Sequence, residues 1–110
     1  MTILKDGSSV VLNVTRDDLN NIVPTLALLE EQLKDECAQI VIVNLETLES
    51  IFSLQIGTLA AMHVMCYENV AVMKLSNVHV HVKSQLTMVG LDKLMAIHHG
   101  SNVVKESFNP

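Results

Sequence analysis

Ser53 is the residue whose place in the sequence most suggests chemistry. Residues 40–43 form a short β-branched run, which is typical of a strand buried on both faces. Beyond Ser53, Ile56, Leu59, Ala60 and His63 recur at helical spacing. We therefore expect Ser53 within one residue of a helix N-terminus, where ligands and partners meet a sheet flanked by helices. Its hydroxyl could instead be only an N-cap, contributing about 1 kcal/mol.

Two histidine pairs, His79-x-His81 and His98-His99, raise the question of a metal site. A His-x-His pair on a strand turns both rings to one face, but zinc needs a third and a fourth ligand. Because His79 falls where a helix should begin, the two rings need not converge. Capping or a solvated loop is the favoured interpretation, and we predict no tightly bound metal and no cofactor.

No complete catalytic constellation stands out in the sequence. There is no Ser-His-Asp order, no glycine-rich phosphate loop and no pair of carboxylates at a useful spacing. Cys66 has no basic neighbour in sequence that would lower the pKa of its thiol, so we interpret it as a small buried hydrophobic residue. Asp17 and Asp18 are interpreted as a solvated turn. The sequence therefore predicts a protein that is not an enzyme.

The composition predicts one globular domain, residues 1–110. Hydrophobic residues make up 49% of the chain but aromatic residues only 3%, so the core must consist of Leu, Val, Ile and Met. A net charge of −5 argues against a nucleic-acid partner, which needs clustered Lys and Arg. Cys37 and Cys66 are expected to be reduced thiols in a cytoplasmic protein. No signal peptide or membrane-spanning run is found, so we expect a soluble protein without direct membrane insertion.

Local patterns predict alternating strands and helices. Asp6-Gly7 is a strong hairpin signal, Pro24 suits the first turn of a helix that Ile22 could extend backwards, and Gly90 suits a helix C-terminal cap. The expected strands are residues 2–5, 9–14, 40–43, 70–78 and 94–97, and the expected helices are residues 24–33, 53–66 and 79–89, with one or two helical turns within 102–108. Polar loops are expected at 15–18 and 67–69.

This order predicts an α/β fold with a mixed, mostly parallel sheet of four to five strands and about four helices. Strand–helix–strand units give right-handed parallel crossovers. The N-terminal hairpin adds an antiparallel edge.

Two motifs resemble the signature of the STAS domain, the fold of bacterial anti-sigma-factor antagonists and of sulphate-transporter tails. The first combines NLETL at 44–48, I-x-S at 51–53 and IG at 56–57. The second is MVGLDKL at 88–94, which looks like the family's late glycine-leucine segment. The spacing between the motifs also matches, and the resemblance covers essentially the whole chain, most weakly before Ile40.

The resemblance implies a STAS-like, non-enzymatic binding module that acts in a partner switch. Such an antagonist binds a serine-kinase anti-sigma factor of the GHKL type, which phosphorylates the serine at the helix mouth, and a phosphatase removes the phosphate. That serine maps onto Ser53. A phosphate there would meet free N–H groups at a helix N-terminus and would add charge to the contact surface.

The motif differs from the family pattern around this serine. Phe52 replaces the family's aspartate, Leu54 its second serine and Gln55 its glycine. The partner-binding residues implied by the resemblance are Phe52, Ser53, Leu54, Gln55 and, on an earlier loop, Asp18. Consecutive residues at a strand–helix junction diverge, so one of Phe52 and Leu54 is expected to be buried, with Phe52 the exposed one.

Two other functions remain open at this stage. One is a STAS-like regulatory subunit of a transporter or stress-signalling complex without sigma-factor control. The other, from a different class, is a small-molecule or nucleotide-binding domain or a minor hydrolase that uses the histidines. The lack of a phosphate loop counts against the second.

Overall fold

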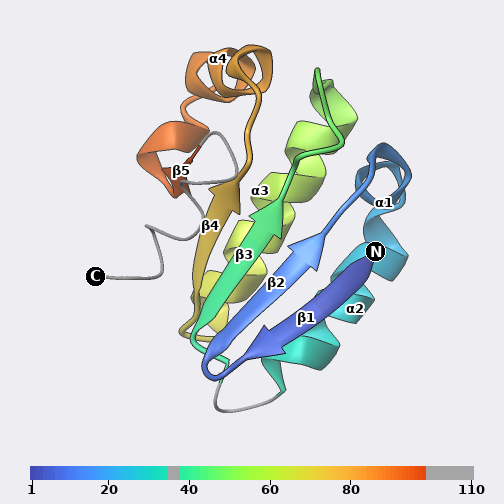
Figure 1. Cartoon of the computed structure of the whole chain (residues 1–110), viewed down its shortest axis with the longest axis vertical. Helices are drawn as coiled ribbons and strands as arrows, with labels where there is room; N and C mark the ends of the chain where they lie inside the picture. Colours follow the sequence, from blue (N-terminus) through green and yellow to red (C-terminus); the bar gives the residue numbers. More distant parts are fainter. Residues whose placement is uncertain (35–37, 99–110) are drawn as a thin grey trace.

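The computed structural model describes residues 1–34 and 38–98 of the chain. Strands and helices follow one another in the order expected of an α/β fold (Figure 1). The elements are β1 (Thr2–Asp6), β2 (Ser9–Asn13), α1 (Arg16–Asn20), α2 (Ile22–Leu33), β3 (Ile40–Asn44), α3 (Ser53–Glu68), β4 (Val72–Ser76), α4 (Val80–Met88), the short 3₁₀ helix η1 (Leu91–Lys93) and β5 (Ala96–Ile97).

The five strands form one mixed sheet in the order β1-β2-β3-β4-β5. β1 pairs antiparallel with β2 through a tight turn at Gly7, whose φ of +61° is a conformation that glycine adopts without strain. The other three pairings are parallel. The predicted N-terminal hairpin and the predicted mixed, mostly parallel sheet are therefore confirmed.

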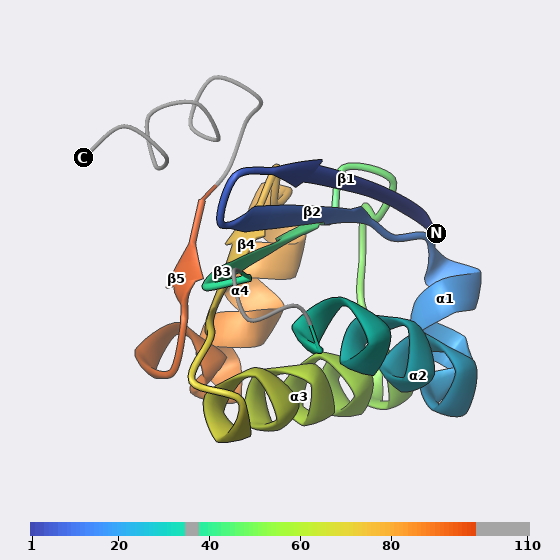
Figure 2. The same cartoon turned by 90° about the horizontal axis from the view of Figure 1, so that it is seen from below.

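The helices bury a single core against one face of this sheet. Helices α1, α2 and α3 lie together on that side (Figure 2). Leu12 and Val43 from the strands join Leu59 of α3 and Leu86 of α4 in the same cluster of buried side chains. Each such side chain stabilises the fold by roughly 1.5–3 kcal/mol relative to an exposed one. This core fixes the positions of the helix ends.

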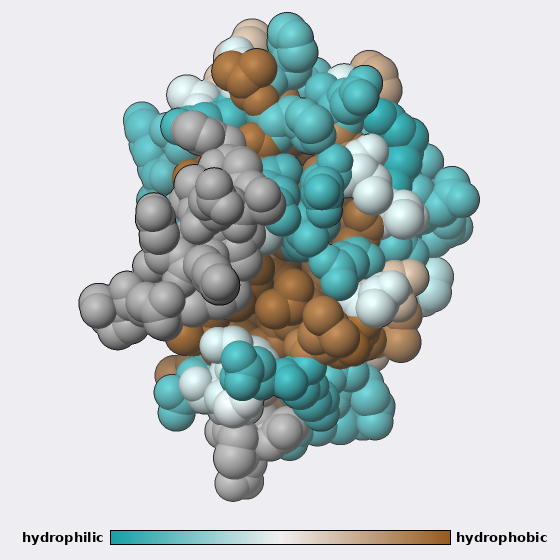
Figure 3. All heavy atoms as spheres, in the orientation of Figure 1, coloured by the Kyte–Doolittle hydropathy of each residue, from teal (hydrophilic) through white to brown (hydrophobic). Residues whose placement is uncertain are grey.

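The opposite face of the sheet is covered by no helix of the described part of the chain. Cross-strand register brings Leu4, Val11, Ile42, Lys74 and Ala96 into one row across it. Figure 3 looks onto this face and shows hydrophobic side chains gathered over the middle of the sheet. No helix among the described residues is long and apolar enough to cross a membrane.

Two predicted loops were wrong. Residues 15–18 form the N-cap and first turn of α1, because the side chain of Asp18 accepts a hydrogen bond from the Thr15 N–H and the Thr15 hydroxyl accepts one from the Asp18 N–H. Tyr67 and Glu68 belong to the last turn of α3. The fourth strand is also shorter than residues 70–78. The predicted turns within 102–108 lie outside the described residues.

Candidate functional site

Ser53 is the first residue of α3, directly after the loop that leaves β3. The prediction that it lies within one residue of a helix N-terminus is confirmed. The N-cap position, however, belongs to Phe52, and the described residues provide no hydrogen bond to the Ser53 hydroxyl. The capping interpretation of Ser53 is therefore wrong. Its side chain is exposed and available at the helix mouth.

Gln55 provides the side-chain contact that caps the helix. Its Oε1 accepts a hydrogen bond from the Phe52 N–H at 2.9 Å, which satisfies one of the N–H groups that a helix start leaves without a partner. Its Nε2 donates to Asn20 Oδ1 at 2.9 Å and so ties α3 to the end of α1. The residue is only 3% exposed. We propose that Gln55 positions the contact surface rather than touching a partner.

Arg16, at the start of α1, holds the same loop from the other side. Its Nη2 donates to the backbone carbonyl of Ser50 at 3.1 Å and to the Ser50 hydroxyl at 3.3 Å. Its Nη1 donates to Gln55 Oε1 at 3.3 Å. The guanidinium carbon lies 5.3 Å from the centre of the Phe52 ring, within the range of a cation–π contact.

A second helix fixes the loop just before Phe52. Gln85 of α4 accepts a hydrogen bond from the Ile51 N–H at 2.9 Å and donates one to the Ile51 carbonyl at 2.7 Å. The Ile51 side chain is buried in the core. The loop therefore enters α3 between fixed contacts to α1 and α4, at the carboxyl end of β3 (Figure 1).

Phe52 and Leu54 both point away from the core, one on each side of Ser53. Phe52 is 60% exposed and Leu54 is 56% exposed. The prediction that one of them is buried was wrong. The buried face of α3 runs through Gln55, Thr58 and Leu59, so the residues at the very start of the helix lie off that face. The result is an apolar surface, here called the helix-mouth surface, consisting of Phe52, Ser53 and Leu54.

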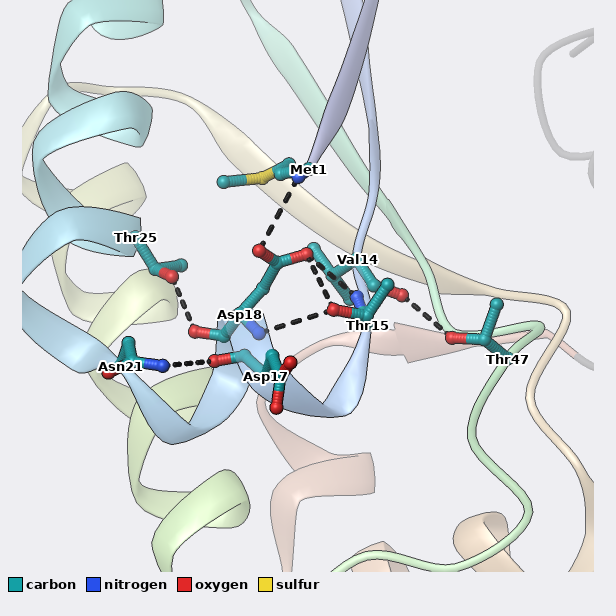
Figure 4. Close-up of polar contacts among 8 residues, drawn as sticks. All are labelled: Met1, Val14, Thr15, Asp17, Asp18, Asn21, Thr25 and Thr47. Carbon is teal, nitrogen blue, oxygen red and sulfur yellow. Dashed lines mark hydrogen bonds and ion pairs between the residues drawn. The ribbon is translucent and has the colours of Figure 1, made fainter.

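Asp18 lies on α1, where its carboxylate contacts other residues of the chain (Figure 4). Its Oδ2 accepts hydrogen bonds from the Thr15 N–H at 2.8 Å and the Thr15 hydroxyl at 3.1 Å. Its Oδ1 lies 3.4 Å from the amino group of Met1. Its backbone carbonyl accepts a hydrogen bond from the Thr25 hydroxyl. Both carboxylate oxygens thus have partners within the chain, and the solvated-turn interpretation of Asp18 was wrong.

The histidines do not gather into a ligand set in the described part of the chain. His79 is the N-cap residue of α4, and its Nε2 lies 2.9 Å from the carbonyl oxygen of Glu46. His81 is exposed two residues further along, as the second residue of α4. Among residues 1–34 and 38–98, no group of three His, Cys, Asp or Glu side chains is close enough to hold a metal ion. His99 lies outside the described residues.

Arg16 and Gln85 are the site residues that the sequence reasoning missed. Both contact the loop from more than thirty positions away in sequence. A partial signal was present for Arg16, because Thr15-x-x-Asp18 is close to a capping-box pattern and marks the start of a helix at that residue. Nothing local to Gln85 marks its contact with Ile51.

Comparisons of fold find close matches, although no protein-family profile and no curated protein sequence matches the chain. A structure from work on the architecture of the stressosome, described as a signal integration and transduction hub, has a TM-score of 0.78 at 17% identity and covers 99% of this chain and 100% of that chain. A variant of RsbS from Moorella thermoacetica has a TM-score of 0.80 at 16% identity and covers 94% of this chain and 92% of that one.

A third match is TM1081 of Thermotoga maritima, described as a candidate anti-sigma factor antagonist. It has a TM-score of 0.73 at 16% identity and covers 96% of this chain and 92% of that chain. The STAS-like fold expected from the two sequence motifs is therefore confirmed over essentially the whole chain. At these identities the likeness establishes the fold.

Proposed function

We propose that this chain is a non-enzymatic regulator that binds a protein partner through the helix-mouth surface. The partner with the most support is a serine-kinase anti-sigma factor of the GHKL type, with a phosphatase as the opposing enzyme, in a cytoplasmic partner switch. One observation carries the proposal: Phe52 and Leu54 are both exposed beside Ser53, in a fold shared with proteins of anti-sigma and stress signalling.

The physical argument starts from the cost of leaving these side chains in water. Exposed apolar groups that cluster at a rigid position mark protein contacts, and buried aromatic side chains commonly dominate the binding energy. The contacts of Arg16, Gln55 and Gln85 hold the loop in place before a partner arrives. A preorganised surface loses less conformational freedom on binding.

Ser53 adds a means of control to this surface. Phosphorylation would place about −1.5 to −2 charges between two apolar side chains. The helix N-terminus stabilises an anion locally, so the fold tolerates the modification. The cost falls on the complex, because a charge within an apolar contact loses its hydration.

The test of partner binding is capture from the native lysate with wild-type protein and matched variants. Phe52→Ser and Leu54→Ser should each lose the partner, whereas Val64→Ser should retain it. Val64 is a similarly exposed apolar residue three turns further along α3, away from the helix mouth. Recovery of the same partner by all four proteins would show that the contact lies elsewhere.

Substitution of Ser53 tests the switch separately. Ser53→Asp should weaken binding to the captured kinase by roughly five- to 150-fold, which corresponds to about 1–3 kcal/mol for burying an unpaired polar group. Ser53→Ala should bind like the wild type, because it adds no charge. Titration calorimetry measures all three affinities. Equal values would show that the chain keeps the fold without the switch.

A second candidate function is supported by the stressosome match: a STAS-like subunit of a stress-signalling complex without direct sigma-factor control. The same capture experiment separates the two. A kinase of the GHKL type supports the first function, and recovery of STAS-domain proteins as a large assembly supports the second.

A further inference from the structure

Arg16 contacts several residues around the start of α3. It is the only arginine in the sequence. Its guanidinium contacts Ser50, Phe52 and Gln55, which stand on both sides of Ser53 in the chain. A cation is therefore held against the chain neighbours of the residue that the proposed kinase would modify, although the fold could have satisfied Ser50 and Gln55 with neutral donors.

The present partners of this guanidinium are all uncharged. They are a backbone carbonyl, a hydroxyl, an amide oxygen and an aromatic ring. Hydrogen bonds from arginine to an ionised acceptor are roughly twice as strong as those between neutral groups, and phosphate also matches the two-pronged geometry of the guanidinium. A phosphate within reach would therefore compete successfully for Arg16.

The first turn of α3 offers further donors to such a phosphate. The N–H groups at the start of a helix have no acceptor within the helix, and the first hydrogen bond of this ladder runs from the Ile56 N–H to the Phe52 carbonyl. The Phe52 N–H is already paired with Gln55. Ser53 is the first residue of this turn, and Arg16 contacts the residue directly before it and Gln55 two residues after it, so both kinds of donor belong to or contact the immediate chain neighbours of Ser53.

We propose that Arg16 is the residue that detects phosphorylation of Ser53. This inference rests on the proposed function. A kinase transfers the terminal phosphoryl group of a nucleoside triphosphate to Ser53 Oγ: the new O–P bond forms, the bond to the nucleoside diphosphate breaks, and the hydroxyl proton passes to a base on the kinase. The guanidinium then leaves Ser50 and the Phe52 ring and pairs with the phosphate.

The consequence is a change in shape as well as in charge. The Phe52 ring loses the cation that holds it, and the Ser50 carbonyl loses its donor. The helix-mouth surface therefore differs between the two forms of Ser53 even where a partner does not touch the phosphate itself. A carboxylate at position 53 is shorter and carries less charge, so Ser53→Asp should reproduce this rearrangement only in part.

The test uses the protein alone, with phosphoserine incorporated at position 53 during translation. Phosphorus NMR follows the second ionisation of the phosphate, whose pKa is ordinarily about 6. A guanidinium partner favours the doubly charged form, so this pKa should be lower in the otherwise wild-type protein than in Arg16→Gln, by roughly one unit. Arg16→Lys, which keeps the charge but not the fork, should retain part of the shift.

A second readout follows the ring of Phe52, one of only two phenylalanines in the chain. Its NMR signals should move when wild-type Ser53 is replaced by phosphoserine, and should move far less when Arg16 is already Gln. Lys93→Gln, which removes an exposed cation from η1, is the control and should change neither readout.

The inference would be overturned if the phosphate pKa were the same in the wild type, Arg16→Gln and Arg16→Lys. Arg16 would then be a purely structural contact. Thermal unfolding checks that the variants are folded. If Arg16→Gln does not fold, the phosphate pKa of Arg16→Lys is compared with that of the wild type instead. No partner is needed for these measurements, so their failure is distinct from a failure to capture a kinase.

Discussion

At the scale of single residues, some side chains at the start of α3 support the loop and others form the surface that a partner can contact. Gln55 and Arg16 turn inward and satisfy backbone groups of the loop. Phe52 and Leu54 turn outward and leave apolar surface in water. The buried Gln55 thus supports the loop under the serine, and the exposed Phe52 and Leu54 make the surface around it apolar.

The buried thiol of Cys66 gives a residue-scale prediction on pH. Desolvation by burial raises its pKa from an ordinary value of 9.0 to about 12. Between these values the native thiol keeps a proton that the unfolded chain has lost. The free energy of unfolding should therefore fall with rising pH, by about 1.4 kcal/mol per pH unit from this group.

Urea unfolding at several pH values between 9 and 12 measures this dependence. Cys66→Ala removes the group, so its stability should fall less steeply over that range, although it starts lower because of the lost packing. Other titrating groups are shared by both proteins and cancel in the comparison. Parallel curves would contradict the prediction. Below pH 9.0, Cys66 should contribute no pH dependence.

Part of the site could be predicted from sequence at this scale. The position of Ser53 followed from a local change of period, from a β-branched run to helical spacing. The directions of Phe52 and Leu54 could not be predicted in the same way, because they depend on how the axis of α3 lies on the core. The contacts of Arg16 and Gln85 join distant segments and leave no local pattern.

At the scale of elements, long segments were predictable and short ones were not. The sequences of β3 and α3 show clear periodicity. Gly90 follows the end of α4 with a φ of +81°, as expected of the glycine that the sequence predicted as a helix C-terminal cap. Helix α1 has only five residues, too few to show a helical repeat. The sequence marks its start only by the pair Thr15 and Asp18, which exchange hydrogen bonds between side chain and backbone (Figure 4).

The end of α3 carries an element-scale prediction. Val70 follows the helix with a φ of +58°, which costs an L-residue roughly 1–2 kcal/mol and is least favourable for a β-branched one. Its side chain is 90% exposed, so little packing offsets that cost. Val70→Gly should raise the free energy of unfolding by about 0.5–1 kcal/mol, after the greater freedom of glycine in the unfolded chain is subtracted.

Chemical denaturation of the two proteins measures the gain. Val72→Gly is the control, because Val72 is also exposed but lies within β4, where glycine should destabilise. A loss of stability in both variants would show that the left-handed conformation at Val70 carries no net strain.

At the scale of the whole molecule, the sheet has two unlike faces. Val41 and Val43 point into the core beneath the helices, whereas Ile42 alternates with them and lies outside that cluster. All three are nevertheless fully buried. The sequence-based interpretation of residues 40–43 as a strand buried on both faces is therefore confirmed at its centre. Figure 3 shows hydrophobic side chains gathered over the middle of the face that no described helix covers.

The sheet face that no described helix covers should also contribute to the stability of the fold. Ile42 is 0% exposed at the centre of the row that runs from Leu4 to Ala96. Ile42→Ala should therefore lower the free energy of unfolding by about 2–5 kcal/mol, the range for truncating a buried aliphatic side chain. Ile40→Ala is the matched control, because Ile40 is on the same strand and face but only half-buried. Its cost should be clearly smaller. Urea unfolding measures both, and equal losses would mean that this face stabilises the fold no more at its centre than at its margin.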